Sequence, residues 1–168
     1  MFSNDEEKKD GISLQLAIPP AEQNKLTSNQ SDFSLPRSKI LRGKRNFQRL
    51  FEKSTALNST SLQFKYRIYD NPDEQCLIGF IAPKRQFKRA VDRNKTKRLL
   101  REAYRLNQHP MQSLFDLHTF GFHGVFIATK KLKNFSMVES EMIPLLEKAR
   151  TRLLRITDNP TSTTTQKK

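Results

Sequence analysis

The chain has 168 residues, and its 31 Lys and Arg against 17 Asp and Glu give a formal net charge of +14. A chain of this length is expected to form one domain with tails, and so much positive charge indicates a large polyanion or an anionic membrane as partner. No apolar run approaches the roughly 18 residues of a membrane span, and the acidic, polar start does not have the pattern of a signal or transit peptide.

Cysteine and histidine are too few and too scattered to predict a disulfide framework or a zinc site. The single cysteine, Cys76, lies in an apolar strand pattern, which predicts a small buried side chain and suits a reducing cytoplasm. None of His109, His118 and His123 has a cysteine or a close acidic companion at metal-ligand spacing. We therefore expect no metal ion held by the protein.

Both ends of the chain are predicted to be disordered tails. Residues 1–35 are polar and carry six acids against three lysines, so they cannot bury enough apolar surface to offset their ordering entropy. Residues 158–168 are similarly polar. The folded domain is expected to span 36–157, and most of the positive charge belongs to it.

The first predicted helix covers about 43–53. Leu41, Phe47, Leu50 and Phe51 are spaced for one apolar face, with basic residues pointing outward. Phe47 and Phe51 are four residues apart and therefore share a face. Periodicity alone favours placing both rings in the core.

Two strands follow. Residues 61–69 alternate strictly, with Leu62, Phe64, Tyr66 and Ile68 on one side and Gln63, Lys65, Arg67 and Tyr69 on the other. After turn-forming residues 70–73, residues 75–82 form a more apolar strand. The two strands are expected to pair as an antiparallel hairpin, and the pattern around 56–59 leaves a further short strand open.

The segment 84–105 is the most basic part of the chain, with ten Lys or Arg against Asp92 and Glu102. Beyond Ala90 it has helix-forming composition. Five cations then repeat every fourth residue, while Leu99, Ala103 and Leu106 form a narrow core face; the cations are Arg89, Arg93, Lys97, Arg101 and Arg105. Like charges at this spacing repel, so the stripe costs helix stability unless an anion neutralises it, and a nucleic acid backbone is the expected anion.

The rest of the chain completes an α+β pattern. Residues 107–123 form a connection, broken from the basic helix at Pro110, that includes a possible short helical turn. Residues 124–130 are predicted to be a buried strand. A last helix is expected from Ser136 to about 157, with Ser136 and Glu139 as a capping box and Pro144 as a potential kink. Helices packed on a sheet of about four strands make an α+β sandwich.

One motif resembles a known family. Arg93-Asn94, Lys97-Arg98 and Arg101-Glu102 follow Lys84-Arg85 at a strand end, and Phe47-Gln48-Arg49-Leu50-Phe51 lies upstream. This arrangement resembles the protein component of bacterial ribonuclease P over about residues 36–157. The resemblance implies a two-layer α+β sandwich of order αβββαβα, similar to a domain of a ribosomal protein, with an unusual left-handed βαβ crossover.

The resemblance also implies a function. The partners would be the catalytic RNA of ribonuclease P and precursor tRNA, whose single-stranded 5′ leader is removed by hydrolysis. The RNA would perform the chemistry with Mg²⁺, so no catalytic residue is expected in the protein. The protein would act in the cytoplasm, away from membranes, as a monomer in a 1:1 complex with the RNA.

The resemblance assigns residues to two surfaces. The catalytic RNA is expected to contact Lys84, Arg85, Arg89, Arg93, Asn94, Lys97, Arg98, Arg101 and Arg105. The leader is expected to contact Phe47, Phe51, Lys65 and Tyr66, because a single strand binds a cationic groove with aromatic faces. The resemblance therefore implies that a leader base stacks on at least one of Phe47 and Phe51, whereas periodicity alone favours placing both rings in the core.

Three other functions share part of this pattern. A general RNA-binding or ribosome-associated protein on a similar fold would share the charge. A nuclease acting without RNA would need converging carboxylates for Mg²⁺, and the acids of the folded segment are scattered. A membrane-surface protein would need a broader apolar face on the basic helix.

Overall fold

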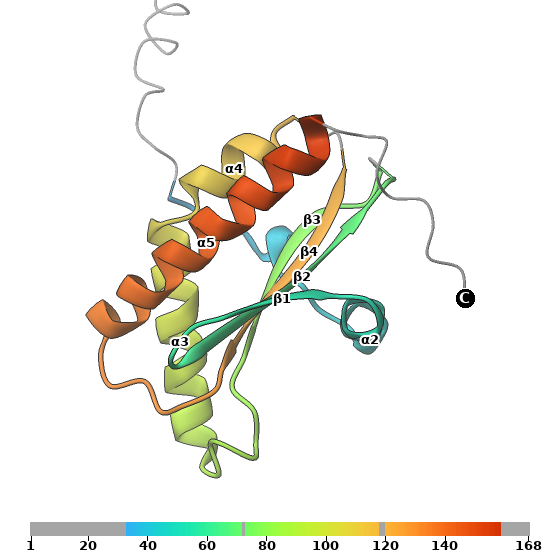
Figure 1. Ribbon diagram of the computed structural model, residues 1–168. Helices are drawn as coiled ribbons and strands as arrows, with labels where there is room; N and C mark the ends of the chain where they lie inside the picture. The colour runs from blue at the N-terminus through green and yellow to red at the C-terminus, as the bar shows by residue number, and fades with distance from the viewer. Residues whose placement is uncertain (1–32, 72, 118–119, 159–168) are drawn as a thin grey trace, which may run out of the picture. The chain divides into compact units, whose positions relative to one another are not determined.

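The computed structural model describes residues 33–71, 73–117 and 120–158, and most of the predicted tails, 1–35 and 158–168, lies outside these residues. Residues 33–35 are described, and Leu35 packs against the core instead of belonging to a tail. The elements follow one another in an order that matches the α+β prediction (Figure 1). They are η1 (Arg37–Lys39), α2 (Lys44–Glu52), β1 (Thr55–Asn58), β2 (Leu62–Tyr69), β3 (Cys76–Ile81), α3 (Ala90–Leu106), α4 (His109–Phe115), β4 (Gly121–Ala128) and α5 (Phe135–Asp158).

The four strands form one sheet in the order β1-β2-β4-β3. β4 pairs antiparallel with β2, where Phe64 faces Phe126, and parallel with β3, where Phe80 faces Phe126. The predicted β2–β3 hairpin is therefore wrong, because β4 lies between these two strands. β4 is buried along almost its whole length, and such an apolar strand is most stable in the middle of a sheet.

The parallel pair β3–β4 is joined through α3 and α4, so this part of the chain is a βαβ crossover. The left-handed sense of the crossover stays a prediction. Because the two strands are parallel, the segments that leave their carboxyl ends emerge at the same edge of the sheet (Figure 1).

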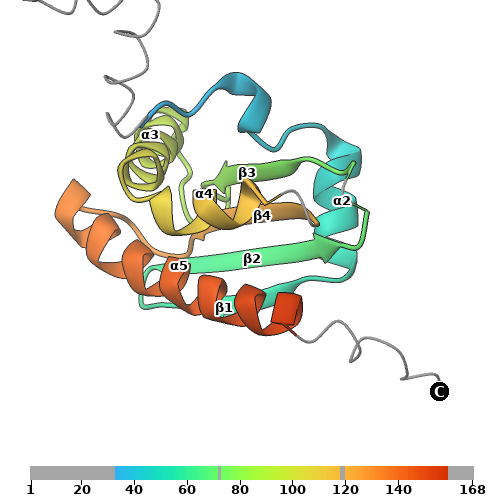
Figure 2. The same ribbon diagram turned by 90° about the horizontal axis from the view of Figure 1, so that it is seen from above.

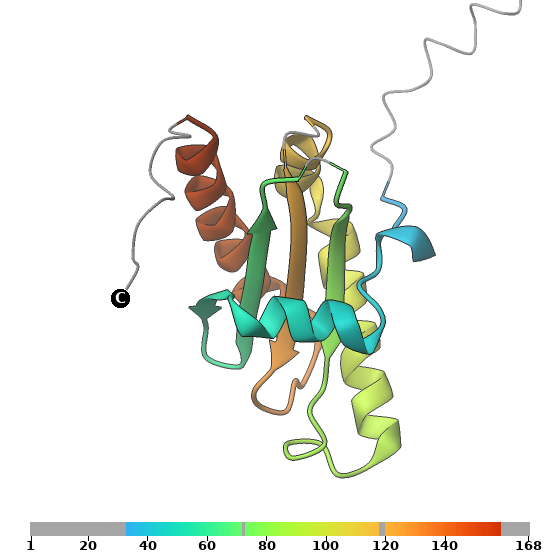
Figure 3. The ribbon, with the colours of Figure 1, turned by 90° about the vertical axis from the view of Figure 1, so that its right-hand side faces the viewer.

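The main core lies between the sheet and the three helices α3, α4 and α5 (Figure 2). Its centre is a group of stacked rings from the strands, with Phe64 and Phe126 centroids 4.3 Å apart. α2 crosses the opposite face of the sheet (Figure 3), where it packs on a smaller cluster that includes Leu41, Leu50 and Val125. Helices thus cover both faces of the sheet.

Glycines allow α2 to start where it does and to lie close to the sheet. Gly43 precedes the helix with φ of 82°, a conformation that side chains with a Cβ rarely adopt. A Cβ at Gly79 would lie 3.3 Å from both Leu41 and the Phe47 ring. Phe47 therefore packs directly on the β3 backbone.

The buried face of α3 is rotated from the predicted one. It consists of Thr96, Leu100, Ala103 and Tyr104, whereas Leu99 and Leu106 are only half-buried. Tyr104 lies between the helix and the sheet, 5.9 Å from both Phe80 and Phe126 between ring centroids. A large aromatic residue buries more area than a leucine, which favours this rotation.

The C-terminal elements differ from prediction in their boundaries. α4 begins beside Pro110, which lies in the first turn, where proline is tolerated. β4 begins at Gly121, three residues earlier than expected. The predicted capping box at Ser136 is wrong: Asn134 Oδ1 accepts from the Met137 amide at 3.0 Å, and Glu139 instead accepts from the Asn107 side chain at 2.9 Å.

Candidate nucleic-acid interface

The cations of α3 divide into paired ends and an unpaired middle. Arg93 donates to the carbonyl oxygens of Phe87 at 3.0 Å and Lys88 at 2.7 Å, which holds the turn before the helix. Arg105 pairs with Glu102 at 2.6 Å and donates to the Phe33 carbonyl at 3.1 Å. These two arginines have structural roles in the free protein.

The middle of α3 carries cations that are not paired within the protein. Lys97, Arg98 and Arg101 are exposed, and none forms a hydrogen bond or ion pair with another residue that the structure describes. Glu102 does not neutralise them, because its hydrogen bond to Arg105 engages it and lowers its pKa. The helix therefore presents unpaired positive charge to solvent.

The predicted basic approach to α3 is an exposed turn at the carboxyl end of β3. The Pro83 carbonyl accepts from the amides of Gln86 and Phe87, both at 3.0 Å, and the Phe87 ring is buried. Lys84, Arg85 and Arg89 are all exposed. The buried phenylalanine fixes the turn, so these cations project from an anchored segment.

A groove of about 350 Å³ joins the two predicted surfaces. We call it the α3 groove; its walls are Ile40, Leu41, Phe47, Phe80, Asn94, Lys97, Arg98 and Arg101. One wall is cationic and belongs to α3, and the other is apolar and belongs to the η1–α2 segment and β3. Residues assigned to the catalytic RNA and to the leader thus meet in one groove.

Two further arginines extend the positive surface beside the α3 groove, and neither was among the predicted site residues. Arg37 and Arg42 are exposed. The pKa of Arg42 is lowered by partial loss of hydration and then by repulsion from Arg37 and Arg101. The sequence signal is weak, because Arg42 comes close to Arg101 of α3 only in the folded chain.

The two phenylalanines of α2 have different environments. Phe47 is half-buried against Leu41 and Gly79, whereas Phe51 is 43% exposed. Their rings stack with centroids 6.3 Å apart at 19°. Lys65 Nζ lies 5.5 Å from the Phe51 ring centroid, within the range of a cation–π contact. The prediction from periodicity that both rings are core residues is therefore wrong for Phe51.

The assignment of Tyr66 to the leader surface is wrong. Its side chain is only 3% exposed and lies in the main core, with its ring 5.6 Å from both Phe64 and Phe122 between centroids. Lys65, the preceding residue, faces α2 on the other side of the sheet because side chains alternate along a strand. The alternation of the sequence along β2 predicts this burial, because it puts Tyr66 on the apolar side of the strand.

A closed polar network holds the other end of α2 on the sheet. Arg49 forms two hydrogen bonds with Glu74, of 2.8 and 3.3 Å. Glu74 Oε1 lies 3.5 Å from His123 Nε2, and His123 Nδ1 lies 3.1 Å from the Tyr69 hydroxyl. Arg49 and Arg67 flank the Tyr69 ring, at 4.7 and 5.0 Å from its centroid.

Burial is the main reason that the pKa of His123 in this network is lowered. His123 is 1% exposed, and burial lowers its pKa more than nearby Glu74 raises it, with Arg49 and Arg67 adding to the decrease. The hydrogen bond to Glu74 raises the pKa of Arg49. The sequence did not predict this network, because its residues come from four separate segments.

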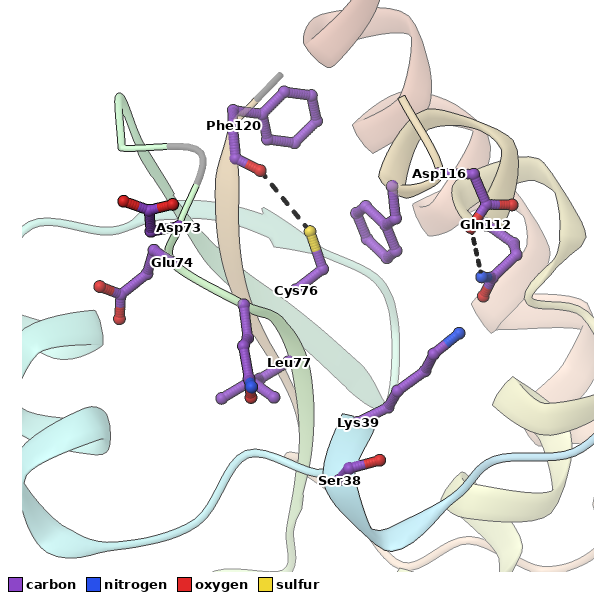
Figure 4. Close-up of a pocket in the computed structure, with 11 residues that line it drawn as sticks. Ser38, Lys39, Asp73, Glu74, Cys76, Leu77, Gln112, Asp116 and Phe120 are labelled. Carbon is purple, nitrogen blue, oxygen red and sulfur yellow. Dashed lines mark hydrogen bonds between the residues drawn. The ribbon is translucent and has the colours of Figure 1, made fainter. Parts of the chain in front are cut away.

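A separate pocket of about 320 Å³ lies beside η1 and α4 (Figure 4). Cys76 lies in its wall and its Sγ is 3.7 Å from the Phe120 carbonyl oxygen. Burial raises the pKa of this thiol to about 11, so it stays protonated and unreactive at neutral pH. Cys76 is half-buried, whereas the sequence pattern predicts a buried side chain.

Within the described ranges, no three His, Cys, Asp or Glu side chains converge to hold a metal ion. Among the helices of that part of the chain, none is long and apolar enough to span a membrane.

Fold and surface together define an α+β protein with an unpaired cationic helix face beside an aromatic-lined groove. The family model described as Ribonuclease P matches residues 35–150. The chain therefore belongs to the ribonuclease P protein family.

Individual relatives agree with this assignment. The ribonuclease P protein component of Chlorobaculum tepidum is 33% identical over 141 residues, covering 80% of this chain and 87% of the relative. That of Nitrosomonas eutropha is 34% identical over 82 residues, 49% of this chain and 68% of the relative. The solved ribonuclease P protein of Thermotoga maritima superimposes with a TM-score of 0.52 at 27% identity, covering 65% of this chain and 96% of that one.

Proposed function

We propose that this protein is the protein subunit of a ribonuclease P ribonucleoprotein in the cytoplasm. It binds the catalytic RNA through the exposed cations of α3 and binds the single-stranded 5′ leader of precursor tRNA across α2. It thereby promotes endonucleolytic removal of the leader to give the mature tRNA 5′ end. One protein binds one RNA, and no membrane takes part.

The observation that carries this proposal is the α3 groove. It combines Lys97, Arg98 and Arg101, which lack protein partners among the described residues, with the aromatic wall that includes Phe47. Cations without partners suit a phosphate backbone, whose binding releases condensed counterions. Exposed Phe51, with Lys65 beside it, supplies a face on which a base can stack without sequence preference.

The chemistry belongs to the RNA in this proposal. Phosphodiester hydrolysis by a protein alone would need carboxylates placed to hold divalent metal, and the described residues do not provide such a cluster. We therefore assign Mg²⁺ to sites formed mainly by the RNA. The protein contributes substrate affinity and charge neutralisation.

Reconstitution with the catalytic RNA at low Mg²⁺ tests the proposal. The protein should restore cleavage of precursor tRNA, and it should raise affinity more for tRNA with a leader than for tRNA without one. Binding of the RNA should weaken roughly a thousandfold or more between 50 and 200 mM salt if six to ten phosphates are contacted. Equal affinity for both tRNA forms would instead favour a general RNA-binding protein, and cleavage by RNA-free protein would indicate a nuclease.

A further inference from the structure

A second group of cations lies on the side of α3 that faces away from the α3 groove. We call it the lysine pocket; it encloses about 330 Å³ and is lined by Phe87, Asp92, Lys95, Thr96, Lys131, Leu132 and Lys133. Three lysines surround it against one acid. None of these lysines belongs to the RNA-binding residues predicted from the sequence.

The sheet topology brings these cations together. β3 and β4 are parallel, so the segments after Ile81 and after Ala128 leave the sheet at the same edge (Figure 1). The first segment is the basic approach that contains Phe87, and the second contains Lys131 and Lys133. Ligands commonly bind at the carboxyl ends of neighbouring parallel strands, because loops from both strands converge there.

The β4–α5 segment is anchored, so its lysines are held in place. Leu132 is only 6% exposed and packs in the main core. Asn134 caps α5 directly after the segment, and the Thr129 amide donates to the Ser61 carbonyl directly before it. Lys131 and Lys133 flank the buried leucine and are both exposed. A fixed pair of cations loses less entropy on binding an anion than a mobile pair.

The lysine pocket is continuous with the cationic face of α3. Lys95, Arg98 and Arg101 together line a shallow surface along the helix. Positive charge therefore runs from the α3 groove over the helix to the lysine pocket. Neither α2 nor β2, which carry the proposed leader surface, contributes a residue to the lysine pocket.

We propose that the lysine pocket binds backbone phosphates of a second segment of the catalytic RNA, so that α3 lies between two stretches of RNA backbone. This inference rests on the proposed function and adds a contact to it. Lys95, Lys131 and Lys133 pair with phosphates, while Asp92 limits how deeply an anion enters. The proposal assigns the pocket to the catalytic RNA and not to the leader, because α2 and β2, which carry the proposed leader surface, do not line it.

The test compares Lys131→Gln/Lys133→Gln with the matched control Lys148→Gln/Arg152→Gln, which removes two exposed cations from α5. The full chain is titrated against the catalytic RNA at several salt concentrations. Each lost phosphate contact should reduce the slope of log affinity against log salt by about one, so the pocket variant should lose about two. The control should keep the wild-type slope, and thermal unfolding should show that both variants fold.

Each outcome has a distinct meaning. A pocket variant with the same slope and affinity as the control overturns the lysine pocket while leaving the proposed function intact. A variant that loses preference for tRNA with a leader, but not affinity for the catalytic RNA, overturns the assignment to that RNA. Failure of the wild-type chain to bind the catalytic RNA overturns both proposals.

Discussion

The surroundings of the two ends of α2 differ in how their cations are paired. One end lies at the α3 groove, which we call the unpaired end, and the other contains the network of Arg49, Glu74 and His123, which we call the paired end. Near the α3 groove, Lys97, Arg98 and Arg101 have no partner among the described residues. At the other end, Arg49 is bound to Glu74, and Arg67 donates to the Arg49 carbonyl oxygen. Cations paired within the protein stabilise the fold, whereas unpaired cations repel one another until an external anion arrives. Pairing within the protein, more than the amount of charge, therefore distinguishes the paired end, which stabilises the fold, from the unpaired end, which is the proposed binding surface.

Charge reversal in the unpaired end should give the largest effect on binding. Arg98→Glu/Arg101→Glu should weaken affinity for the catalytic RNA roughly a hundredfold or more at moderate salt, because two phosphate contacts become repulsive. The melting temperature should hardly change, since both side chains are exposed and unpaired. Filter binding and thermal unfolding measure the two quantities.

The matched control is Lys148→Glu/Arg152→Glu on α5, which changes the net charge equally. It should retain most of the affinity. If the α3 variant instead unfolds at a much lower temperature, the two arginines are structural and the contrast between the two ends is lost.

Removing the carboxylate of Glu74 at the paired end should lower the stability of the fold and leave RNA affinity nearly unchanged. Glu74→Gln leaves Arg49 without its bidentate partner and removes the carboxylate beside buried His123. We expect a loss of about 1–3 kcal/mol in the free energy of unfolding, the usual cost when a partly buried charged hydrogen bond loses a partner. Urea unfolding measures this loss. RNA affinity of the folded fraction should stay near that of the wild type, and a selective loss of RNA binding would place Glu74 in the interface.

Substitutions of Phe51 and Tyr66 test whether leader binding depends on the exposed ring and not on the buried one. Phe51→Ala should lower affinity for tRNA carrying a leader by about tenfold, because one stacked base contributes about 1–3 kcal/mol. Affinity for tRNA without a leader should not change. Tyr66→Phe is the comparison, since this ring lies in the main core and should leave leader binding unaltered. A leader defect in the Tyr66 variant would restore that residue to the binding surface.

Local sequence patterns predict which side chains share one face of a helix or strand, because this depends only on their spacing along the chain. The period of four along α3 predicts an exposed cationic face, which Arg89, Lys97 and Arg101 confirm, and the alternation along β2 separates Lys65 from Tyr66. The motif that resembles ribonuclease P proteins assigns binding residues to α2 and α3, and this assignment stays a prediction. For Tyr66 the alternation, which predicts a buried ring, is correct, and the position implied by the resemblance is wrong.

Features set by tertiary contacts were missed. The position of β4 between β2 and β3 depends on burying the most apolar strand, and no local signal competes with the expectation that successive strands pair. The lysine pocket follows from that strand order, because it requires β3 and β4 to be parallel. The approach of Arg42 to Arg101 depends in turn on how the η1–α2 segment crosses the sheet.

The smallest expected effect is a pH dependence of stability at the paired end. Burial holds the pKa of His123 below its ordinary value in the folded protein, against the opposing effect of Glu74. The unfolded chain therefore takes up a proton first as the pH falls. Stability should be greatest above the ordinary histidine pKa of about 6.5 and should decrease as the pH falls from there towards the lower folded-state pKa.

His123→Gln tests this sign, because glutamine keeps polar atoms near Glu74 and Tyr69 without titrating. One extra proton bound on unfolding limits the slope to about 1.4 kcal/mol per pH unit, and the variant should lose this component between pH 7.5 and 5.5. Urea unfolding across that range gives the slope for both proteins. An unchanged slope would mean that other groups carry the pH dependence, whereas stability rising towards acid only in the wild type would mean that Glu74 dominates and that His123 is charged in the folded network. Since Arg49 already satisfies Glu74 in two hydrogen bonds, the neutral ring is the expected state and the paired end should weaken in acid.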